Sequence, residues 1–393
     1  MSWPMVKLKD CCQVVGGATP KRNIASYWDG DIPWITPKDV SNLDEPYIYE
    51  APEYISSAGY KAAATYMLPA GTVLLTSRAP IGNVAIAGID LCTNQGFKSL
   101  IPGRYVYNKY LYHCIKRFVP QLELLGNGAT FKEVSKSVVE NFEIPLPPFE
   151  EQKRISDILD KVDGIRQKRE QAIKIADDFL RATFLDIFGD PVKNPKRWGV
   201  TSLLEYGSFK NGMNFSKGES GTTLKCLGVG DFKSLATITC MDNIGEIELN
   251  TLPSDDYLLK DGDIVFVRSN GNKALVGRCL TIYPNKEKVT FSGFCIRYRI
   301  GNSAIIPEYL NFLFRTPSMK QQMLSGGQGA NIQNISQGTL SALRIPVPPL
   351  DKQIAFAKLV DFHASIVKKQ YDKMAESEKL FNALTGDFFT FNE

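Results

Sequence analysis

The sequence lacks the signatures of several common protein classes. Its two histidines, His113 and His363, do not cluster with other metal-binding or catalytic residues. Its eight cysteines include no CxxC pair, which disfavours a structural zinc site and a thioredoxin-like motif. No apolar run approaches the roughly 18 residues of a membrane span, and the first four residues begin no signal peptide. We therefore expect a cytoplasmic protein that contacts no membrane and keeps its thiols reduced.

Charge is present but unevenly distributed. The 393 residues carry a net charge of +4, and 44% of them are hydrophobic, as in an ordinary globular protein of two or three domains. Residues 191–350 hold 18 Lys and Arg against 12 Asp and Glu, whereas residues 150–190 hold 8 against 10. A phosphate backbone requires a basic face, so this distribution permits nucleic acid binding without demanding it.

The most informative feature of the sequence is a repeat. Ile144-Pro-Leu-Pro-Pro148 returns 201 residues later as Ile345-Pro-Val-Pro-Pro349. Further matches, in the same order along the chain, join 126–131 with 327–332, Gln152 with Gln353, Tyr110-Leu111 with Tyr309-Leu310, Gly96-Phe97 with Gly293-Phe294, and 71–75 with 262–266. The chain is therefore predicted to be a tandem duplication, in which each copy is a globular unit followed by a long helix.

Each globular unit shows short strand patterns broken by Gly, Pro, Asn and Asp. They lie at 32–36, 71–76 and 83–87 in the first copy, and at 264–268, 276–282 and 294–300 in the second. A short helix is predicted at about 107–118, with a counterpart at 307–315. Each unit is thus predicted to have an α+β fold.

The two long helical patterns are at 149–189 and 350–389. The first has an apolar stripe at Ile155, Ile158, Val162, Ile165, Ala172, Ala176 and Phe179. The second has a less regular stripe that includes Val360, Val367, Phe381 and Phe388. We expect the two helices, each about 60 Å long, to pair as an antiparallel coiled coil with a pseudo-two-fold axis. The predicted domains are 1–148 and 191–349, each followed by a helical spacer at 149–190 or 350–393.

The order of the parts resembles that of a known family, the specificity subunits of type I restriction–modification systems, over essentially the whole chain, and two segments resemble it in detail. The segments are Ile144-Pro-Leu-Pro-Pro-Phe-Glu-Glu-Gln-Lys-Arg-Ile155 and Phe184-Leu-Asp-Ile-Phe-Gly-Asp-Pro-Val-Lys-Asn-Pro-Lys-Arg-Trp198. The resemblance implies two target-recognition domains, each reading one half of a split double-stranded DNA sequence. The C-terminal helix departs from the pattern, since it has neither the Lys-Arg-Ile run nor the Phe-Gly-Asp-Pro exit.

The same resemblance implies partners. The helices would set the distance between the half-sites and dock two methyltransferase subunits, with restriction or motor subunits joining the complex. The chain itself would be no enzyme and hold no cofactor, because SAM, ATP and Mg²⁺ would bind the partner subunits.

Polar residues in the loops that follow the strands are the candidate DNA contacts. Arg and Lys bind phosphate or guanine, and Asn and Gln bind adenine, so loops rich in these types suit a DNA surface. In the first copy the candidates are Thr19, Lys21, Arg22, Asn23, Thr36, Lys38, Ser77, Arg78, Asn83, Asn94, Gln95, Lys98, Thr130 and Lys132. In the second they are Lys210, Asn211, Asn214, Lys217, Arg268, Ser269, Asn270, Asn272, Lys273, Gln328, Asn331, Gln333 and Asn334.

Arg78 and Arg268 are the strongest candidates, because each follows a core strand that would hold its base in place. Each candidate also has a purely structural interpretation. The arginines could form internal salt bridges, the loop at 16–23 could be a solvated turn, and the amides at 94–95 could satisfy buried backbone. The glycine-rich segments at 126–132 and 327–334 are either anion-binding nests or plain turns.

Catalytic motifs are missing from the sequence. Asn194-Pro195 is followed by Lys196 and not by the Pro-aromatic pair that completes the Asn-Pro-Pro-Tyr motif of adenine methyltransferases. No glycine-rich loop ends in the Gly-Lys-Ser/Thr of a nucleotide-binding P-loop. Two alternatives remain open: a free-standing methyltransferase or nuclease of unusual motif, and a protein-binding adaptor with paired modules. The prediction we favour is a non-catalytic DNA sequence-recognition subunit.

Overall fold

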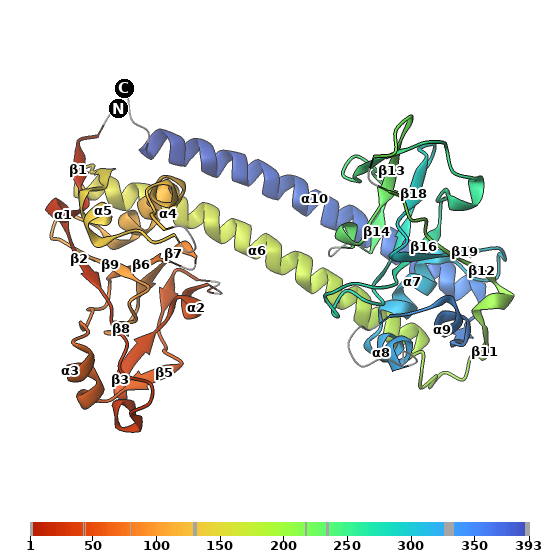
Figure 1. Cartoon of the computed structure of the whole chain (residues 1–393), viewed down its shortest axis with the longest axis horizontal. Coiled ribbons are helices and arrows are strands. Elements are labelled where there is room, and N and C mark those ends of the chain that lie inside the picture. The colour runs from red at the N-terminus through yellow and green to blue at the C-terminus, as the bar shows by residue number, and fades with distance from the viewer. Residues whose placement is uncertain are drawn as a thin grey trace. The chain divides into compact units, whose positions relative to one another are not determined.

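The computed structural model describes residues 3–389 except 42, 44, 79, 129–131, 217, 233–235 and 326–333. The chain divides into two compact units (Figure 1). Unit 1 comprises 1–171 together with 370–393, and unit 2 comprises 172–369. We call the globular part of unit 1, residues 3–148, module 1, and that of unit 2, residues 191–349, module 2. Each unit also contains one segment of each long helix.

Module 1 is built from three small sheets. A five-stranded sheet has the order β2 (Cys12–Gly16), β9 (Lys98–Pro102), β6 (Val73–Ser77), β7 (Ile81–Ala87), β4 (Tyr47–Ile48). A three-stranded sheet has the order β5 (Glu53–Ile55), β3 (Trp28–Ile35), β8 (Cys92–Thr93), and β1 (Met5–Lys7) pairs with β10 (Glu143–Pro145). The helices are α1 (Leu8–Cys11), α2 (Pro37–Val40), α3 (Ser57–Ala63), α4 (Asn108–Leu124) and α5 (Lys136–Asn141).

Module 2 repeats this topology strand for strand. Its five-stranded sheet has the order β12 (Gly207–Asn211), β19 (Cys295–Ile300), β16 (Asp263–Val267), β17 (Cys279–Ile282), β14 (Thr237–Ile238). The smaller sheets are β15 (Glu246–Leu249), β13 (Thr222–Leu227), β18 (Val289–Phe291) and the pair β11 (Gly199–Ser202), β20 (Arg344–Val347). Its helices are α7 (Pro307–Arg315), α8 (Pro317–Ser325) and α9 (Gln337–Ser341). The predicted duplication and the α+β class are confirmed.

The central strands of the two modules are buried along their whole length. β6 reads Val-Leu-Leu-Thr-Ser and β16 reads Asp-Ile-Val-Phe-Val. A nearly continuous apolar run suits a strand that is covered on both faces. The one charge in β16, Asp263, accepts hydrogen bonds of 2.9 and 2.7 Å from Nε and Nη2 of Arg299, so it is not buried alone.

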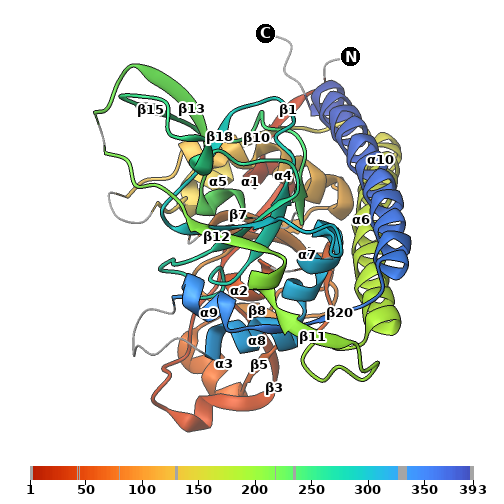
Figure 2. The same cartoon turned by 90° about the vertical axis from the view of Figure 1, so that its right-hand side faces the viewer.

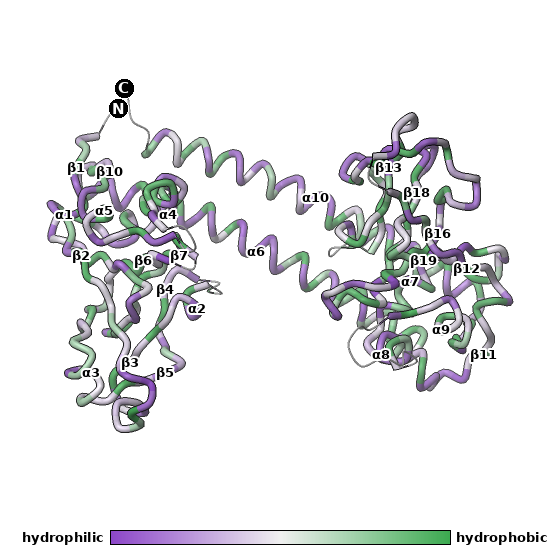
Figure 3. Tube along the Cα trace, viewed as in Figure 1, coloured by the Kyte–Doolittle hydropathy of each residue, from purple (hydrophilic) through white to green (hydrophobic). Residues whose placement is uncertain are grey.

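The long helices are α6 (Phe149–Phe188) and α10 (Leu350–Phe389), each of 40 residues as predicted. Pro147-Pro148 precede α6, whose end is marked by Gly189 at a φ of +80°, a left-handed conformation that favours glycine. In each unit the segments of α6 and α10 lie side by side and antiparallel (Figures 1 and 2). Figure 3 shows hydrophilic and hydrophobic residues mixed along both helices, as expected when only one stripe is buried.

The buried stripe of α6 differs from the predicted one. Phe179 is 68% exposed, Ile165 is 46% exposed and Ala172 is also exposed, so the prediction was wrong for these three. The hydrophobic residues that α6 buries are Ile155, Leu159, Ile173, Leu180, Phe184 and Phe188. In unit 1 a polar residue occupies the seam, since Arg169 donates to the carbonyl of Lys373 at 2.5 Å and to the hydroxyl of Ser377. Apolar spacing alone cannot detect a seam position that is filled by arginine.

A buried glutamine holds the start of each long helix. Gln152 accepts a hydrogen bond of 2.8 Å from the backbone N–H of Tyr107 and donates to the carbonyls of Tyr105 and Pro147 at 2.9 and 2.8 Å. Gln353 makes the three equivalent bonds in unit 2, at 2.8–3.1 Å. This anchor is part of the duplicated scaffold, because both copies use the same atoms.

Replacing Gln353 by alanine is expected to lower the free energy of unfolding of unit 2 by about 2 kcal/mol, because one donor and two acceptors lose their partner. Hydrogen exchange of unit 2 peptides in increasing denaturant measures this loss. The matched control is Gln322→Ala at an exposed position of α8, expected to cost less than about 0.5 kcal/mol. Equal losses in the two variants would rule out the anchor.

Candidate nucleic-acid interface

The candidate residues of module 1 gather where several strands end. β2 and β6 end on the same side of their sheet, and β3 and β8 end beside them. We call the loops that follow these four strands edge 1. Gly17 shows how closely they pack, because a Cβ atom there would lie 2.2 Å from the carbonyl oxygen of Thr93. A Cβ on Gly96 would lie 2.8 Å from Pro37, which brings the loop after β3 against the loop after β8.

Two cations at edge 1, Arg78 and Lys98, share one carboxylate of the module. Lys98 Nζ lies 3.1 Å from a carboxylate oxygen of Glu133, and Arg78 Nη1 lies 3.7 Å from the other. Lys98 also donates to the hydroxyl of Ser77 at 3.2 Å. Ser77 is 1% exposed, so its side chain offers no atom to a molecule outside, contrary to its selection as a candidate contact. Gln95 is exposed at this edge and its side chain pairs with the hydroxyl of Thr19.

Arg22, in the loop after β2, is held from two sides. Its guanidinium forms a bidentate pair with Glu53 at 2.5 and 2.9 Å and lies 3.9 Å from the ring centroid of Trp28. Hydrogen bonding to Arg22 lowers the pKa of Glu53, so the pair stays charged at neutral pH. In this conformation Arg22 stabilises its own loop, whereas Lys21 and Asn23 beside it are exposed.

The equivalent loops of module 2, those after β12, β13, β16 and β18, form edge 2. Four backbone hydrogen bonds at the two edges correspond one to one, which fixes the equivalent positions. At edge 1 the bonds run from Ala18 N to Thr93 O (2.9 Å), Asn94 N to Ile35 O (3.1 Å), Ser77 N to Gly96 O (2.7 Å) and Val134 N to Ser77 O (3.0 Å). In the same order, those of edge 2 run from Met213 N to Phe291 O (3.0 Å), Ser292 N to Leu227 O (3.0 Å), Arg268 N to Phe294 O (2.8 Å) and Ile335 N to Arg268 O (3.0 Å).

This correspondence corrects the predicted repeat by one residue. Gly96 is equivalent to Phe294 and not to Gly293, because its carbonyl accepts from Ser77 at the end of β6 just as that of Phe294 accepts from Arg268 at the end of β16. Phe97 is buried, whereas Phe294 is 60% exposed at edge 2. The sequence match failed because a Gly-Phe pair occurs in both loops in different registers. For this reason the sequence did not predict that Phe294 is exposed.

Arg268 is one of the cations of edge 2. Its side chain is exposed, and its Nη1 donates to the carbonyl oxygen of Gly293 at a long 3.4 Å. Among the described residues, no carboxylate lies within 4 Å of its guanidinium. The position equivalent to Glu133 is held by the neutral Asn334, since the bridges Arg78–Glu133 and Ser269–Asn334 correspond. Arg268 at edge 2 thus has no described carboxylate beside it, whereas Arg78 at edge 1 is paired with Glu133.

The remaining candidates differ in what they contact. Thr36 caps α2 through Asp39, Asn94 accepts from Gly96 N at 2.8 Å, and Asn83 donates to Ser41 at 2.8 Å. Lys210 lies 3.5 Å from Asp256, and the side chains of Asn270 and Asn272 stabilise their own turn. Lys38, Lys132, Asn211, Asn214 and Lys273 are exposed. Thr130, Lys217, Gln328, Asn331 and Gln333 lie outside the described residues.

Neither histidine lies at an edge. His363 lies 3.0 Å from Asp177, where α10 and α6 meet in unit 2. His113 Nε2 lies 2.7 Å from Asp160 of α6, to which Lys109 also donates at 2.6 Å. No group of three or more His, Cys, Asp or Glu within the described part of the chain could hold a metal ion.

Stability of unit 1 is expected to fall in acid because of Asp160. Burial raises the pKa of this carboxyl, but the hydrogen bonds from His113 and Lys109 outweigh burial, and the pKa is lowered. A carboxyl with a lowered folded-state pKa contributes stability above its unfolded value and loses it as pH falls. Between about pH 5 and pH 3, the denaturation midpoint of unit 1 should fall more steeply in the wild type than in Asp160→Asn. Asp157→Asn, an exposed carboxyl on the same helix, should behave as the wild type.

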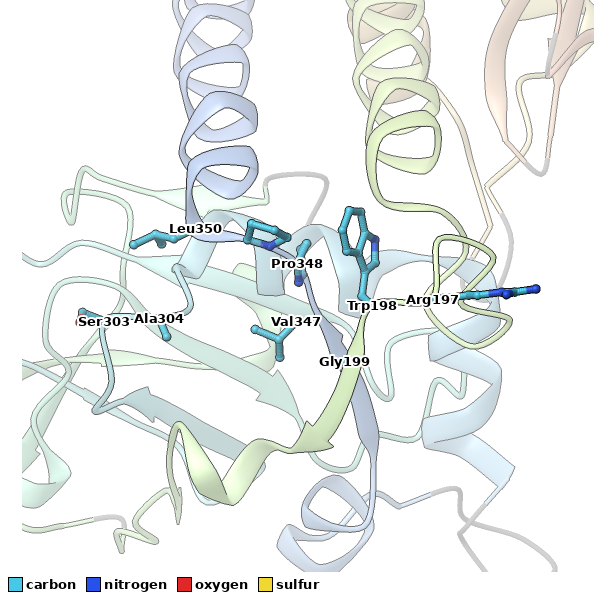
Figure 4. A pocket seen from close by; sticks show the side chains of 9 residues that line it. Arg197, Trp198, Gly199, Ser303, Ala304, Val347, Pro348 and Leu350 are labelled. Atoms are coloured by element: carbon cyan, nitrogen blue, oxygen red, sulfur yellow. The ribbon is translucent and has the colours of Figure 1, made fainter.

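An open pocket of about 600 Å³ lies at the start of α10 in unit 2 (Figure 4). Trp198, Val347, Pro348 and Leu350 line it, and Trp198 donates to the carbonyl of Phe188 at 3.0 Å. Its lining is mainly apolar and carries no cluster of ionisable groups for catalysis. None of the helices formed by the described residues combines the length and apolar character that a membrane crossing demands.

The comparisons with known proteins agree with this architecture. A family model described as the type I restriction modification DNA specificity domain matches residues 2–175 and 197–373. The specificity subunit of the type I restriction enzyme MjaIX of Methanocaldococcus jannaschii is 35% identical over an alignment of length 289, which covers 68% of this chain and 66% of that relative, just under two thirds. The EcoKI specificity subunit of Escherichia coli K12 is 23% identical over 94% of this chain and 84% of its own length.

A solved structure shows the same fold. The S subunit of a type I restriction–modification system from M. genitalium has a TM-score of 0.55 at 14% identity, covering 100% of this chain and 97% of its own. A chain from a structural study of type I system assembly has a TM-score of 0.58 at 19% identity, covering 98% and 96%. With two matching segments that together span most of its length, this chain belongs to the type I restriction–modification DNA specificity family.

Proposed function

We propose that the chain is a DNA sequence-recognition subunit whose two modules each read one half of a split target. The observation that carries the proposal is the pair of edges: one backbone frame, held by corresponding hydrogen bonds, that presents different side chains in the two modules. To read different bases directly, the two modules need side chains that start from fixed backbone positions and differ in their hydrogen-bond donors and acceptors. Two frames of this kind in one chain suit a target made of two unlike halves.

The long helices act as the spacer in this proposal. Each is a single helix of 40 residues, which corresponds to about 60 Å. The ends of α6 and α10 enter the module cores: Phe184 and Phe356 pack together in unit 2, and Ile155 and Phe389 belong to one core in unit 1. A helix whose ends are fixed by core packing transmits its length to the modules that it connects.

Catalysis is assigned to partner subunits. Outward-facing apolar side chains on the helix segments of unit 2 support protein docking there. These are Ile175 and Phe179 of α6, 60% and 68% exposed, and Leu359 and Phe362 of α10, 40% and 65% exposed. The partners would be two methyltransferase subunits and, through them, restriction or motor subunits, which would bind SAM, ATP and Mg²⁺. This chain contributes recognition and spacing.

The test is methylation of a random DNA library by the chain with and without its co-expressed methyltransferase subunit. Sequencing of methylated adenines should give a split motif with a fixed gap, and only when the partner is present. Binding of the complex should weaken linearly on a plot of log affinity against log salt, because phosphate contacts release counterions. Methylation by the chain alone would favour a free-standing enzyme. A partnered complex without sequence preference would favour a protein-binding adaptor.

A further inference from the structure

Edge 2 differs from edge 1 at two equivalent positions that lie next to each other. Where module 1 has Ser77, buried and hydrogen-bonded, module 2 has the exposed Arg268. Where module 1 has Gly96, module 2 has Phe294, 60% exposed. The bond from Arg268 N to Phe294 O, 2.8 Å long, joins the two residues directly. The arginine and phenylalanine side chains therefore extend from neighbouring backbone positions that are hydrogen-bonded to each other.

The backbone of Arg268 is fixed on both sides. Its N–H donates to Phe294, and its carbonyl accepts from Ile335 N at 3.0 Å, immediately after the fully buried strand β16. Phe294 is fixed in turn by a bond from its N–H to the hydroxyl of Ser292 at 3.3 Å. The hydrogen bonds fix the backbone positions of both residues but leave the ends of their side chains free to move. A residue that contacts a base edge needs such a fixed backbone position.

The guanidinium of Arg268 has N–H donors that can bind a molecule outside the module. It donates to one backbone carbonyl, that of Gly293, at 3.4 Å, and no carboxylate of the described residues lies within 4 Å of it. Arg22 and Arg78 of module 1 are each paired with a glutamate. Arg268 can therefore turn to an outside acceptor without breaking an ion pair.

From these observations, and resting on the proposed function, we propose that module 2 reads a guanine through Arg268, with Phe294 against the methyl group of a neighbouring thymine. Guanine presents two acceptors, N7 and O6, at the spacing of an arginine fork in the major groove, and thymine presents an apolar methyl there. Module 1 has neither side chain at the equivalent positions. Only the half-site of module 2 is therefore read in this way.

The experiment uses the complex of the full chain with its methyltransferase subunits. The target of the wild type is first mapped on a random library, and the library is repeated with Arg268→Ala. The variant should lose preference for guanine at one position of one half-site by about 10- to 100-fold, while the other half-site and the gap stay unchanged. The wild type should then discriminate against 7-deazaguanine, which lacks N7, at that position. Arg268→Ala should not.

Two further variants separate base reading from other roles. Arg268→Lys keeps the charge but not the fork, so it should retain the salt dependence of binding and still lose preference for guanine. Arg344→Ala removes an exposed arginine of the same module that also makes a long backbone bond, 3.3 Å to Val200, and should leave the target unchanged. Phe294→Ala should weaken the preference for thymine at the position next to that guanine.

Several outcomes would overturn the inference and leave the proposed function intact. They are an unchanged motif in Arg268→Ala, a uniform loss of methylation at every sequence, full rescue by lysine, or indifference of the wild type to 7-deazaguanine. Absence of any sequence-specific methylation by the wild-type complex would instead overturn the proposed function.

Discussion

Replacing Phe184 by alanine is expected to lower the free energy of unfolding of unit 2 by about 3–5 kcal/mol. The ring is 2% exposed, and its centroid lies 5.0–6.0 Å from those of Phe188, Tyr309, Phe312 and Phe356. These neighbours come from three elements, α6, α7 and α10, so they cannot collapse together into the cavity that alanine would leave. The loss should be seen as a lower denaturant midpoint for unit 2 peptides in hydrogen exchange.

Phe179→Ala is the matched control for this prediction. Phe179 lies five residues earlier on α6 and is 68% exposed, so its removal should change the free energy of unfolding by less than about 0.5 kcal/mol. Because Phe179 belongs to the proposed docking surface, the control should instead weaken assembly with the methyltransferase subunit in a pull-down. If Phe179→Ala destabilised unit 2 as strongly as Phe184→Ala, the assigned buried face of α6 would be wrong.

The scaffold could be predicted from the sequence because its determinants recur. Gln152 and Gln353 make the same three buried bonds, and Tyr110 and Tyr309 each donate to the carbonyl of a proline at 2.7 Å. Residues of this kind tolerate little change, so they remain visible as matches between the copies. Prolines before the long helices and Gly189 after α6 mark boundaries for reasons that are local to the chain.

The charge state of the edges could not be predicted in the same way. Arg22 is neutralised by Glu53, 31 residues away, and Arg78 by Glu133, farther still along the chain. No local pattern connects such pairs, so Arg78 and Arg268 were equivalent candidates in the sequence. They became different only when the fold placed Glu133 beside Arg78, whereas the corresponding residue of module 2, Asn334, is neutral and pairs with Ser269.

Lengthening both long helices by one turn is expected to change the gap of the DNA target and to abolish methylation of the native one. Four residues add about 6 Å to a helix, the length of about two base pairs, so the gap should grow by about one to two base pairs. Gly164 is a suitable site in α6, because a Cβ atom added there would meet no atom outside its own helix turn within 4 Å. The matching insertion in α10 follows Lys379, close to Ser377, which pairs with Arg169.

Sequencing of methylated adenines in a random library measures both the gap and the bases read. The bases should stay those of the wild type, because edges 1 and 2 lie in the modules, and neither insertion disturbs the hydrogen bonds that hold them. A matched control replaces residues at the same two sites without changing the length, and it should keep the native gap. The spacer role would be refuted by a double insertion that kept the native gap, or by one that changed the bases read. In the first case the separation of the half-sites must be set within the modules, and in the second the helices must take part in reading the sequence.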